Sequence, residues 1–236
     1  MKPSPLLNTK FTPPPSTGSL PRPHLIQWLD DQSDRRLILL SAPPGYGKTT
    51  LLANFLAAHT GPGAWYQLEA ADSDPTVFLT YLIEAIRRAK WKKAAKFGQN
   101  AQALLDNPEA GMASQRALTV LINEMNEQLP EHFLIVLEDY HVIASPVVHQ
   151  LVDYLLENAP PSLRLILSTR ADPRQLPGRA ARVGRKKLCE PRGQIQSAIV
   201  VITSPDWSRK YTFTLAAVVP EWFCTWISVS QPCIWL

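Results

Sequence analysis

The chain has 236 residues, 45% of them hydrophobic and 19% charged, which is enough for one α/β domain with a substantial core. Its formal net charge of +4 is unevenly placed: residues 1–170 contain 15 Lys and Arg against 16 Asp and Glu, and residues 171–236 contain 9 against 4. The main part of the chain is therefore close to neutral, and the net charge does not identify it as a nucleic-acid-binding domain.

The chain begins with a proline-rich region, in which seven of the first 23 residues are proline. This composition predicts an extended, polyproline-like arm. No apolar segment follows Lys2, so the pattern is not that of a secretory signal peptide, and we expect a cytoplasmic protein. We assign residues 1–30 to this arm and a lead-in helix.

The next segment, Arg36 to Leu56, reads RLILLSAPPGYGKTTLLANFL. Its apolar beginning, Leu37 to Leu40, predicts a buried parallel strand, and its end predicts a helix because apolar residues recur there at helical spacing. Between the two, Ala42 to Thr49 follows the pattern G-x-x-x-x-G-K-[ST], with alanine in place of the first glycine. The segment therefore predicts a loop that cradles phosphates.

Such a loop binds anions because a helix N-terminus presents unpaired N–H groups and a partial positive charge. We expect Gly45 and Gly47 to be the positions with positive φ. Lys48 is predicted to contact the β and γ phosphates of ATP, and the Thr49 hydroxyl is predicted to bind Mg²⁺. The other nucleotide contacts that we expect come from Ala42, Tyr46 and Thr50.

A second apolar run, Phe133 to Leu137, predicts another buried strand, and Glu138 and Asp139 follow it directly. Carboxylates at the end of a parallel strand lie where ligands bind in such sheets. We predict that Glu138 binds the metal and that Asp139 orients or activates the attacking water, although the two roles are exchangeable. The alternative is that both carboxylates only cap the strand end in water.

Two further strands are predicted at Gly63 to Leu68 and at Leu163 to Ser168. Because strands alternate with helical patterns, the fold class is α/β: a P-loop NTPase with a mostly parallel sheet flanked by helices, incomplete, with its core at residues 31–173. Arg170 follows the last of these strands. It is a candidate for sensing the γ-phosphate, and the alternative is a solvated arginine.

Other polar clusters receive less specific interpretations. Asp72 to Asp74 suggest a second metal site, but Asp74 followed by Pro75 is the pattern of a helix start, which we favour. His141 and His149 follow the acidic strand without a third ligand nearby in the sequence, so we interpret them as packing or surface residues.

A family resemblance rests on four stretches of the chain: LLNTKFTPP, RPHLIQWLDDQSDRRLILLSAPPGYGKTTLLANFL, AWYQLEAADSDPTVFLTYLIEAI and FLIVLEDYHVIASPVVHQLVDYLLENAPPSLRLILSTRADP. They span residues 6 to 173, with a poorly matched gap near 90 to 115. Together they resemble the N-terminal ATP-binding part of the MalT-like, LuxR-type ATP-dependent transcriptional regulators, which belong to the STAND class of P-loop NTPases.

The resemblance implies ATP and Mg²⁺ as ligands, Lys48 and Thr49 as their contacts, Arg170 as a sensor arginine, and self-association. It also implies that the arm lies along the nucleotide-binding domain with Arg22 to Leu25 beside the adenine; a loose leader is the alternative. The chain departs from the family at Glu138, where aspartate is usual. We expect the winged-helix, helical-repeat and DNA-binding modules of the family to be absent.

The composition changes after Pro173. Residues 174–236 contain all three cysteines and four of the seven tryptophans, and follow no usable period. We interpret this segment as an irregular tail that arose by a reading-frame change or gene truncation, and we expect the sheet edge beside the phosphate-loop strand to be unpaired. Two other interpretations of this tail are weaker: GRAARVGRKK as a nucleic-acid patch, and YTFTLAAVVPEWFCTWISVSQPCIWL as a membrane anchor, which Pro220 and Glu221 interrupt.

The sequence thus predicts an ATP-binding, weakly hydrolysing signal-transduction module of a MalT-like regulator, without direct DNA binding or a membrane partner. The alternative is a non-catalytic truncated remnant or interaction fragment with no specific activity. A small-molecule kinase is disfavoured, because no acceptor site or arginine-rich lid is visible after the acidic strand.

Overall fold

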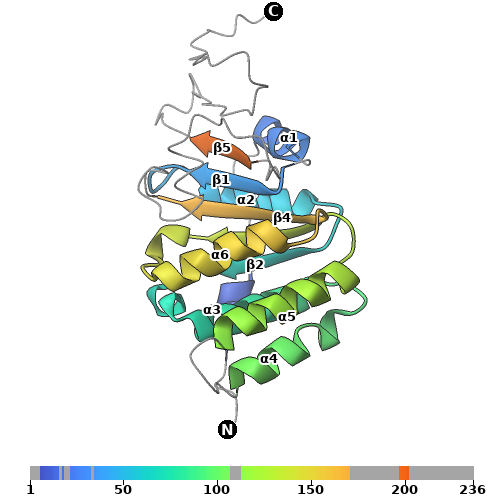
Figure 1. Cartoon of the computed structure of the whole chain (residues 1–236). Coiled ribbons are helices and arrows are strands. Elements are labelled where there is room, and N and C mark those ends of the chain that lie inside the picture. Colours follow the sequence, from blue (N-terminus) through green and yellow to red (C-terminus); the bar gives the residue numbers. More distant parts are fainter. Residues whose placement is uncertain are drawn as a thin grey trace, which may run out of the picture.

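The computed structural model describes residues 6–15, 18, 22–32, 35–106, 113–170 and 197–201. Its centre is a parallel sheet in the order β2-β3-β4-β1-β5 (Figure 1). The strands are β1 (Leu37–Ser41), β2 (Gly63–Gln67), β3 (Phe133–Glu138), β4 (Leu163–Thr169) and β5 (Ser197–Val201). The α/β fold class and the four strands predicted before Pro173 are confirmed.

Helices cover both faces of this sheet (Figure 1). Residues of β1 alternate between two cores, because successive strand side chains point to opposite faces. Ile38 and Leu40 join the core under α1 and α2, whereas Leu37 and Leu39 join the larger core under the other helices. The helices are α1 (Pro23–Asp31), α2 (Lys48–Ala58), α3 (Pro75–Arg88), α4 (Gln99–Asp106), α5 (Ala113–Gln128) and α6 (Pro146–Asn158).

The order of the strands positions the predicted site. The chain passes from β1 to the far strand β2 and returns through β3 and β4, so that β4 pairs with both β3 and β1. Since all pairs are parallel, the carboxyl ends of β1, β4 and β3 lie side by side along one side of the sheet, which we call its carboxyl edge. Ligands of open parallel sheets bind at the carboxyl ends of the strands.

The expectation of an unpaired edge beside β1 is wrong. β5 pairs with β1 in parallel, with Leu37 opposite Ser197 and Ser41 opposite Val201. The sequence of β5, SAIVV, explains the pairing, because the β-branched residues isoleucine and valine are enriched in strands. Residues 174–196 and 202–236 lie outside the described residues, and so do the basic stretch, the apolar stretch and the three cysteines of the proposed tail.

The N-terminal arm is tied to the domain through a buried ion pair. The turn η1 (Asn8–Phe11) packs beside the edge strand β2. Lys10 Nζ lies 2.8 Å from both Asp72 carboxylate oxygens and 4.4 Å from the centre of the Tyr81 ring, and Lys10 and Asp72 are 3% and 0% exposed. Asp72, in the turn η2 (Ala70–Ser73), is thus an ion-pair partner.

The predicted helix start at Asp74 is confirmed. The Asp74 carboxylate accepts hydrogen bonds from the backbone N–H groups of Thr76 and Val77, and Pro75 is the first residue of α3. Among the described residues, no group of three or more His, Cys, Asp and Glu side chains is arranged to hold a metal ion. Within the same part of the chain, no helix is long and apolar enough to cross a bilayer.

Candidate nucleotide-binding site

The predicted phosphate loop connects β1 to α2 and begins at Ala42, whose N–H donates to the Thr169 carbonyl of β4. Gly45 and Gly47 have φ of +83° and +71°, so both are left-handed, as expected. A Cβ on Gly45 would meet nothing within 4 Å, so its backbone angle alone favours glycine. A Cβ on Gly47 would lie 3.0 Å from Nη2 of Arg22, which adds a steric reason.

The loop delivers the N-terminus of α2 to the carboxyl edge of the sheet. Gly47 is the N-cap and makes no side-chain cap bond, and the first turn holds Lys48, Thr49 and Thr50 but no acidic residue. The N–H groups of this turn are therefore not neutralised by a carboxylate. Together with the dipole of the helix they favour an anion at this position.

Lys48 is buried, with 5% exposed, and its ammonium points back into the loop. Nζ donates to the carbonyls of Ala42 at 2.7 Å and Pro43 at 3.2 Å, and it forms no salt bridge with any described carboxylate. Burial lowers the pKa of Lys48, and the nearby charge of Glu138 opposes that shift. The site therefore holds a cation that is hydrogen-bonded but not paired with an anion.

Thr49 and Glu138, the two residues predicted to share a metal ion, are in contact at the carboxyl ends of the strands. Thr49 Oγ1 donates to Glu138 Oε1 at 2.5 Å, although 89 residues separate them in the sequence. Glu138 is 1% exposed, and its second oxygen, Oε2, has no hydrogen-bond partner among the described residues. Burial raises the pKa of Glu138, whereas the hydroxyls of Thr49 and Ser168 and, to a smaller extent, the Lys48 charge lower it.

These two side chains fit a magnesium ion. An unpartnered, buried carboxylate oxygen next to a hydroxyl supplies hard oxygen ligands, and a bound cation compensates a carboxylate that burial otherwise destabilises. Thr49 and Glu138 would hold the ion, whose bound form neutralises phosphate charge.

Asp139 points to different partners. Its backbone is left-handed, with φ of 58°, and its carboxylate accepts two bonds from Arg170, at 3.1 Å from Nε and 3.2 Å from Nη2. His141 Nδ1 lies 3.8 Å from the Asp139 Oδ1 atom. Glu138 and Asp139 thus occupy separate surroundings, one buried beside Thr49 and the other at the surface beside Arg170.

The loop also contacts the segment before α1. Arg22 Nη1 donates to the Tyr46 carbonyl at 3.1 Å, and the Tyr46 ring packs against the core under α1 and α2. The predicted adenine contact of Arg22 to Leu25 is not tested by these contacts, but Arg22 lies at the loop itself. Leu25 is buried in the core.

The two histidines that follow the acidic strand were interpreted as packing or surface residues, and the structure separates them. His141 lies beside Asp139 in the turn η4 (Tyr140–Val142), a neighbour that the sequence interpretation did not assign. His149 is buried instead: its Nδ1 is 2.8 Å from the Tyr140 hydroxyl. This bond anchors the turn that follows Asp139 to α6.

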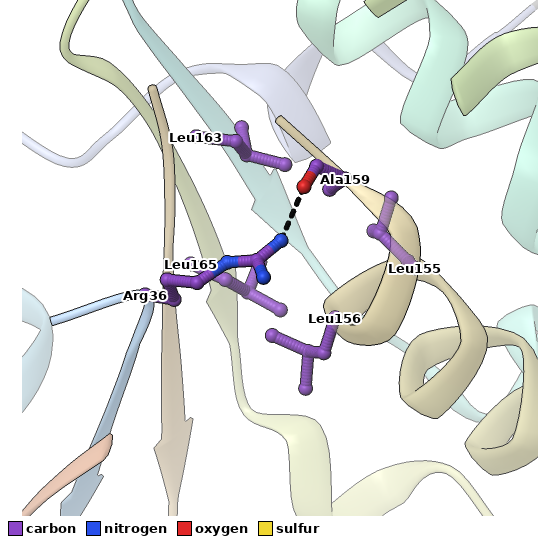
Figure 2. Close-up of a pocket in the computed structure, with 6 residues that line it drawn as sticks. All are labelled: Arg36, Leu155, Leu156, Ala159, Leu163 and Leu165. Atoms are coloured by element: carbon purple, nitrogen blue, oxygen red, sulfur yellow. Dashed lines mark hydrogen bonds between the residues drawn. The ribbon is translucent and has the colours of Figure 1, made fainter. Parts of the chain in front are cut away.

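A small cavity lies away from this edge (Figure 2). Arg36, which precedes β1, donates to the carbonyl of Ala159 just after α6, and four leucines surround it. Burial lowers the pKa of Arg36. Because the cavity is at the amino ends of β1 and β4, it is separate from the phosphate loop. Its arginine donates to the C-cap of α6 and places a positive charge at the C-terminus of that helix.

A model of the AAA ATPase domain family matches residues 24–168, a range that includes the phosphate loop and Glu138 and Asp139 but not Arg170. The chain is also similar to curated proteins described as HTH-type transcriptional regulator MalT. The protein of Vibrio cholerae is 30% identical over 159 residues, or 66% of this chain. The protein of Cronobacter sakazakii is 34% identical over 149 residues, or 63% of this chain.

The chain spans 16% of the length of each of these two relatives. Among solved structures, a Walker-type ATPase of Pyrococcus abyssi is 18% identical, with a TM-score of 0.43 over 64% of this chain and 45% of that one. The sequence relatives agree with the resemblance to the ATP-binding part of MalT-like regulators.

Proposed function

Because the chain belongs to the AAA ATPase domain family, we propose that it binds ATP with Mg²⁺ at the loop Ala42 to Thr50 and acts as the ATP-dependent switch module of a MalT-type transcriptional regulator. Residues 31–173 form this module. The observation that carries the proposal is the buried Lys48 ammonium, which has carbonyl partners but no carboxylate, at the N-terminus of a helix.

The residues divide the work on the nucleotide. The backbone of Gly45 to Lys48 binds the phosphates, and the Lys48 ammonium leaves the Ala42 and Pro43 carbonyls for phosphate oxygens, which carry more negative charge. Thr49 and Glu138 hold the magnesium ion. Asp139 orients the attacking water and Arg170 contacts the γ-phosphate.

We propose further that turnover is slow. Glu138 stands where the family usually has aspartate, which moves the carboxylate by one methylene relative to a metal that tolerates little displacement. Both oxygens of Asp139 also accept from Arg170, which makes them weaker bases toward an attacking water molecule. We expect phosphate release well below about 1 per second, the lower end of ordinary enzyme rates.

A thermal-shift experiment with Mg-ATP tests the binding. At a hundredfold excess of ATP over its Kd, mass action stabilises the folded state by about 2.7 kcal/mol, which raises Tm by roughly 5 to 10 °C. Lys48→Ala should abolish this shift, whereas the exposed Lys92→Ala should keep it. An unchanged Tm of the wild type at millimolar Mg-ATP would contradict the proposal.

A further inference from the structure

Asp139 has two cationic or donor neighbours and is bonded to only one of them. Arg170 donates to both Asp139 oxygens, whereas the His141 Nδ1 atom is 3.8 Å from Asp139 Oδ1, beyond hydrogen-bond distance. Nδ1 is buried and has no hydrogen-bond partner among the described residues. A buried ring nitrogen without a partner, 3.8 Å from a carboxylate that Arg170 holds, is a donor that a small side-chain movement brings into use.

Resting on the function proposed above, we propose that Asp139 exchanges Arg170 for His141 when a nucleoside triphosphate binds, and that His141 is the positioning residue of the hydrolytic arrangement. Arg170 then contacts the γ-phosphate. The Nδ1–H of His141 donates to Asp139 and holds its carboxylate toward the attacking water.

Arg170 is able to leave. Its side chain is 47% exposed, so its ion pair with Asp139 is weakened by water and salt. A planar guanidinium binds a phosphate in the same bidentate manner and gains a more negative partner. Arg170 also lies close enough to Lys48 to affect its pKa, which places it within electrostatic range of the phosphate loop.

His141 is able to replace it. Its ring needs to approach the carboxylate by about 1 Å to reach an ordinary hydrogen bond. Burial lowers the pKa of His141; the Asp139 charge opposes that shift, and the Arg170 and Lys48 charges add to it. The departure of Arg170 leaves Asp139 in need of a donor, which an imidazole N–H supplies.

The turn that carries both residues is held in place during the exchange. The Tyr140 hydroxyl bonds to the buried His149 of α6, and the N–H of Ala144 donates to Ser73 Oγ at 3.1 Å. These two anchors fix the backbone on either side of His141. The exchange thus requires side-chain movement at Arg170 and His141 and none of the sheet.

The first experiment uses the nucleotide-free protein, so that it does not depend on ATP binding. Histidine labelled with ¹⁵N reports the five imidazole rings of the chain, and the His141 signal is assigned by its loss in His141→Gln. Arg170→Ala should produce a slowly exchanging Nδ1–H signal at His141 that the wild type lacks. An unchanged His141 signal in Arg170→Ala overturns the exchange.

The second experiment adds nucleotide. The wild type with Mg²⁺ and a β,γ-non-hydrolysable ATP analogue should show the same Nδ1–H signal, and with ADP it should not. Failure of the analogue to bind at all refutes the proposed function, whereas binding without the signal refutes only the exchange.

Affinity gives an independent readout. His141→Ala should lower the ratio of ATP to ADP affinity about twofold to fivefold, the range of an exposed ion-pair or hydrogen-bond contribution. His141→Asn should restore it, because the asparagine amide places an N–H close to the position of Nδ1. A purely structural histidine would change both nucleotides equally and leave the ratio unaltered, which would contradict the proposal.

Discussion

Two lysines of this protein are buried to nearly the same extent, Lys10 with 3% and Lys48 with 5% exposed, yet their surroundings differ. Lys10 is 2.8 Å from both oxygens of Asp72 and lies over the ring of Tyr81. Among the described residues, Lys48 Nζ bonds to the carbonyls of Ala42 and Pro43 and to no carboxylate, and Glu138 acts on it only from a greater distance. One ammonium is fully neutralised within the fold, and the other is not.

The difference matches the roles proposed for the two charges, one structural and one in nucleotide binding. A buried ion pair that is fully hydrogen-bonded holds two segments together, here an arm and a turn that are 62 residues apart. A buried cation that no carboxylate contacts directly is destabilised by its desolvation, and perturbed charges of this kind cluster at functional sites. The same contrast applies to the carboxylates: Asp72 is paired, whereas Glu138 has an unpartnered oxygen among the described residues.

The largest effect is expected from breaking the structural pair. Lys10→Met keeps the length of the side chain but leaves the Asp72 carboxylate buried without its cation. We expect a loss of about 3–5 kcal/mol in the free energy of unfolding, measured by urea titration. The matched control is the exposed Lys92→Met, which should change it by less than about 0.5 kcal/mol.

A double-mutant cycle sharpens this result. Asp72→Asn in the Lys10→Met background should recover part of the loss, because the amide removes the unpaired charge and still accepts from the backbone N–H of Glu69. If the loss of unfolding free energy in the double variant equalled the sum of the losses in the two single variants, Lys10 and Asp72 would not be coupled. The contrast with Lys48 would then be wrong.

The Lys10 and Asp72 pair also shows where sequence interpretation stops. The phosphate loop was predictable because its strand, glycines, lysine and helix lie within Arg36 to Leu56, so local pattern determines it. An ion pair between an arm and a turn 62 residues away leaves no local pattern, and Asp72 looked like part of a metal cluster or a helix start.

The second prediction is that removing the other buried lysine, Lys48, increases the stability of the protein. Lys48→Met should raise the free energy of unfolding of the nucleotide-free protein by about 1–2 kcal/mol, because the apolar side chain removes a desolvated charge that no described carboxylate contacts directly. The same variant should lose the stabilisation by Mg-ATP. A destabilised nucleotide-free variant would mean that the two carbonyl bonds of Lys48 outweigh its desolvation, and the two lysines would then be alike.

The third prediction concerns Glu138 and pH, in the nucleotide-free protein with EDTA. Its folded-state pKa is raised by burial, so the folded state binds the proton more tightly than the unfolded state. The contribution of Glu138 to stability is full below the unfolded pKa of about 4.3 and declines as pH rises through the folded pKa. Glu138→Gln does not titrate and escapes this decline.

The advantage of Glu138→Gln over the wild type should therefore grow with rising pH, to on the order of 1 kcal/mol at neutral pH. Thermal unfolding from about pH 3.5, below the unfolded pKa, to pH 8 measures it, and Thr49 still has an oxygen acceptor in the variant. A constant difference across this range would contradict a raised pKa at Glu138.

The sequence predicted which residues lie at the carboxyl edge of the sheet, but not which of their side chains contact one another. Buried apolar runs placed Glu138, Asp139 and Arg170 after parallel strands, so a common edge followed from chain order. Which carboxylate faces Thr49 and which faces Arg170 depends on the left-handed backbone of Asp139, a conformation that an aspartate adopts only in context. β5 was missed because it lies within a segment that has no other readable period.

The smallest effect is expected at Asp74, two residues from the buried Asp72, and it separates capping from ion pairing in the same region. Asp74 accepts from two backbone N–H groups at the start of α3, at 2.8 and 3.0 Å, and its side chain faces solvent. Asp74→Ala should lower the free energy of unfolding by about 0.5–1 kcal/mol.

Ser145 is the matched control, because it is the N-cap of α6, also precedes a proline, and makes no side-chain cap bond. Ser145→Ala should therefore change stability by less than about 0.5 kcal/mol in the same urea titration. If Asp74→Ala instead lost as much as Lys10→Met, the stability of this region would come from the start of α3, and the Lys10 and Asp72 pair would not be what distinguishes it from the phosphate loop.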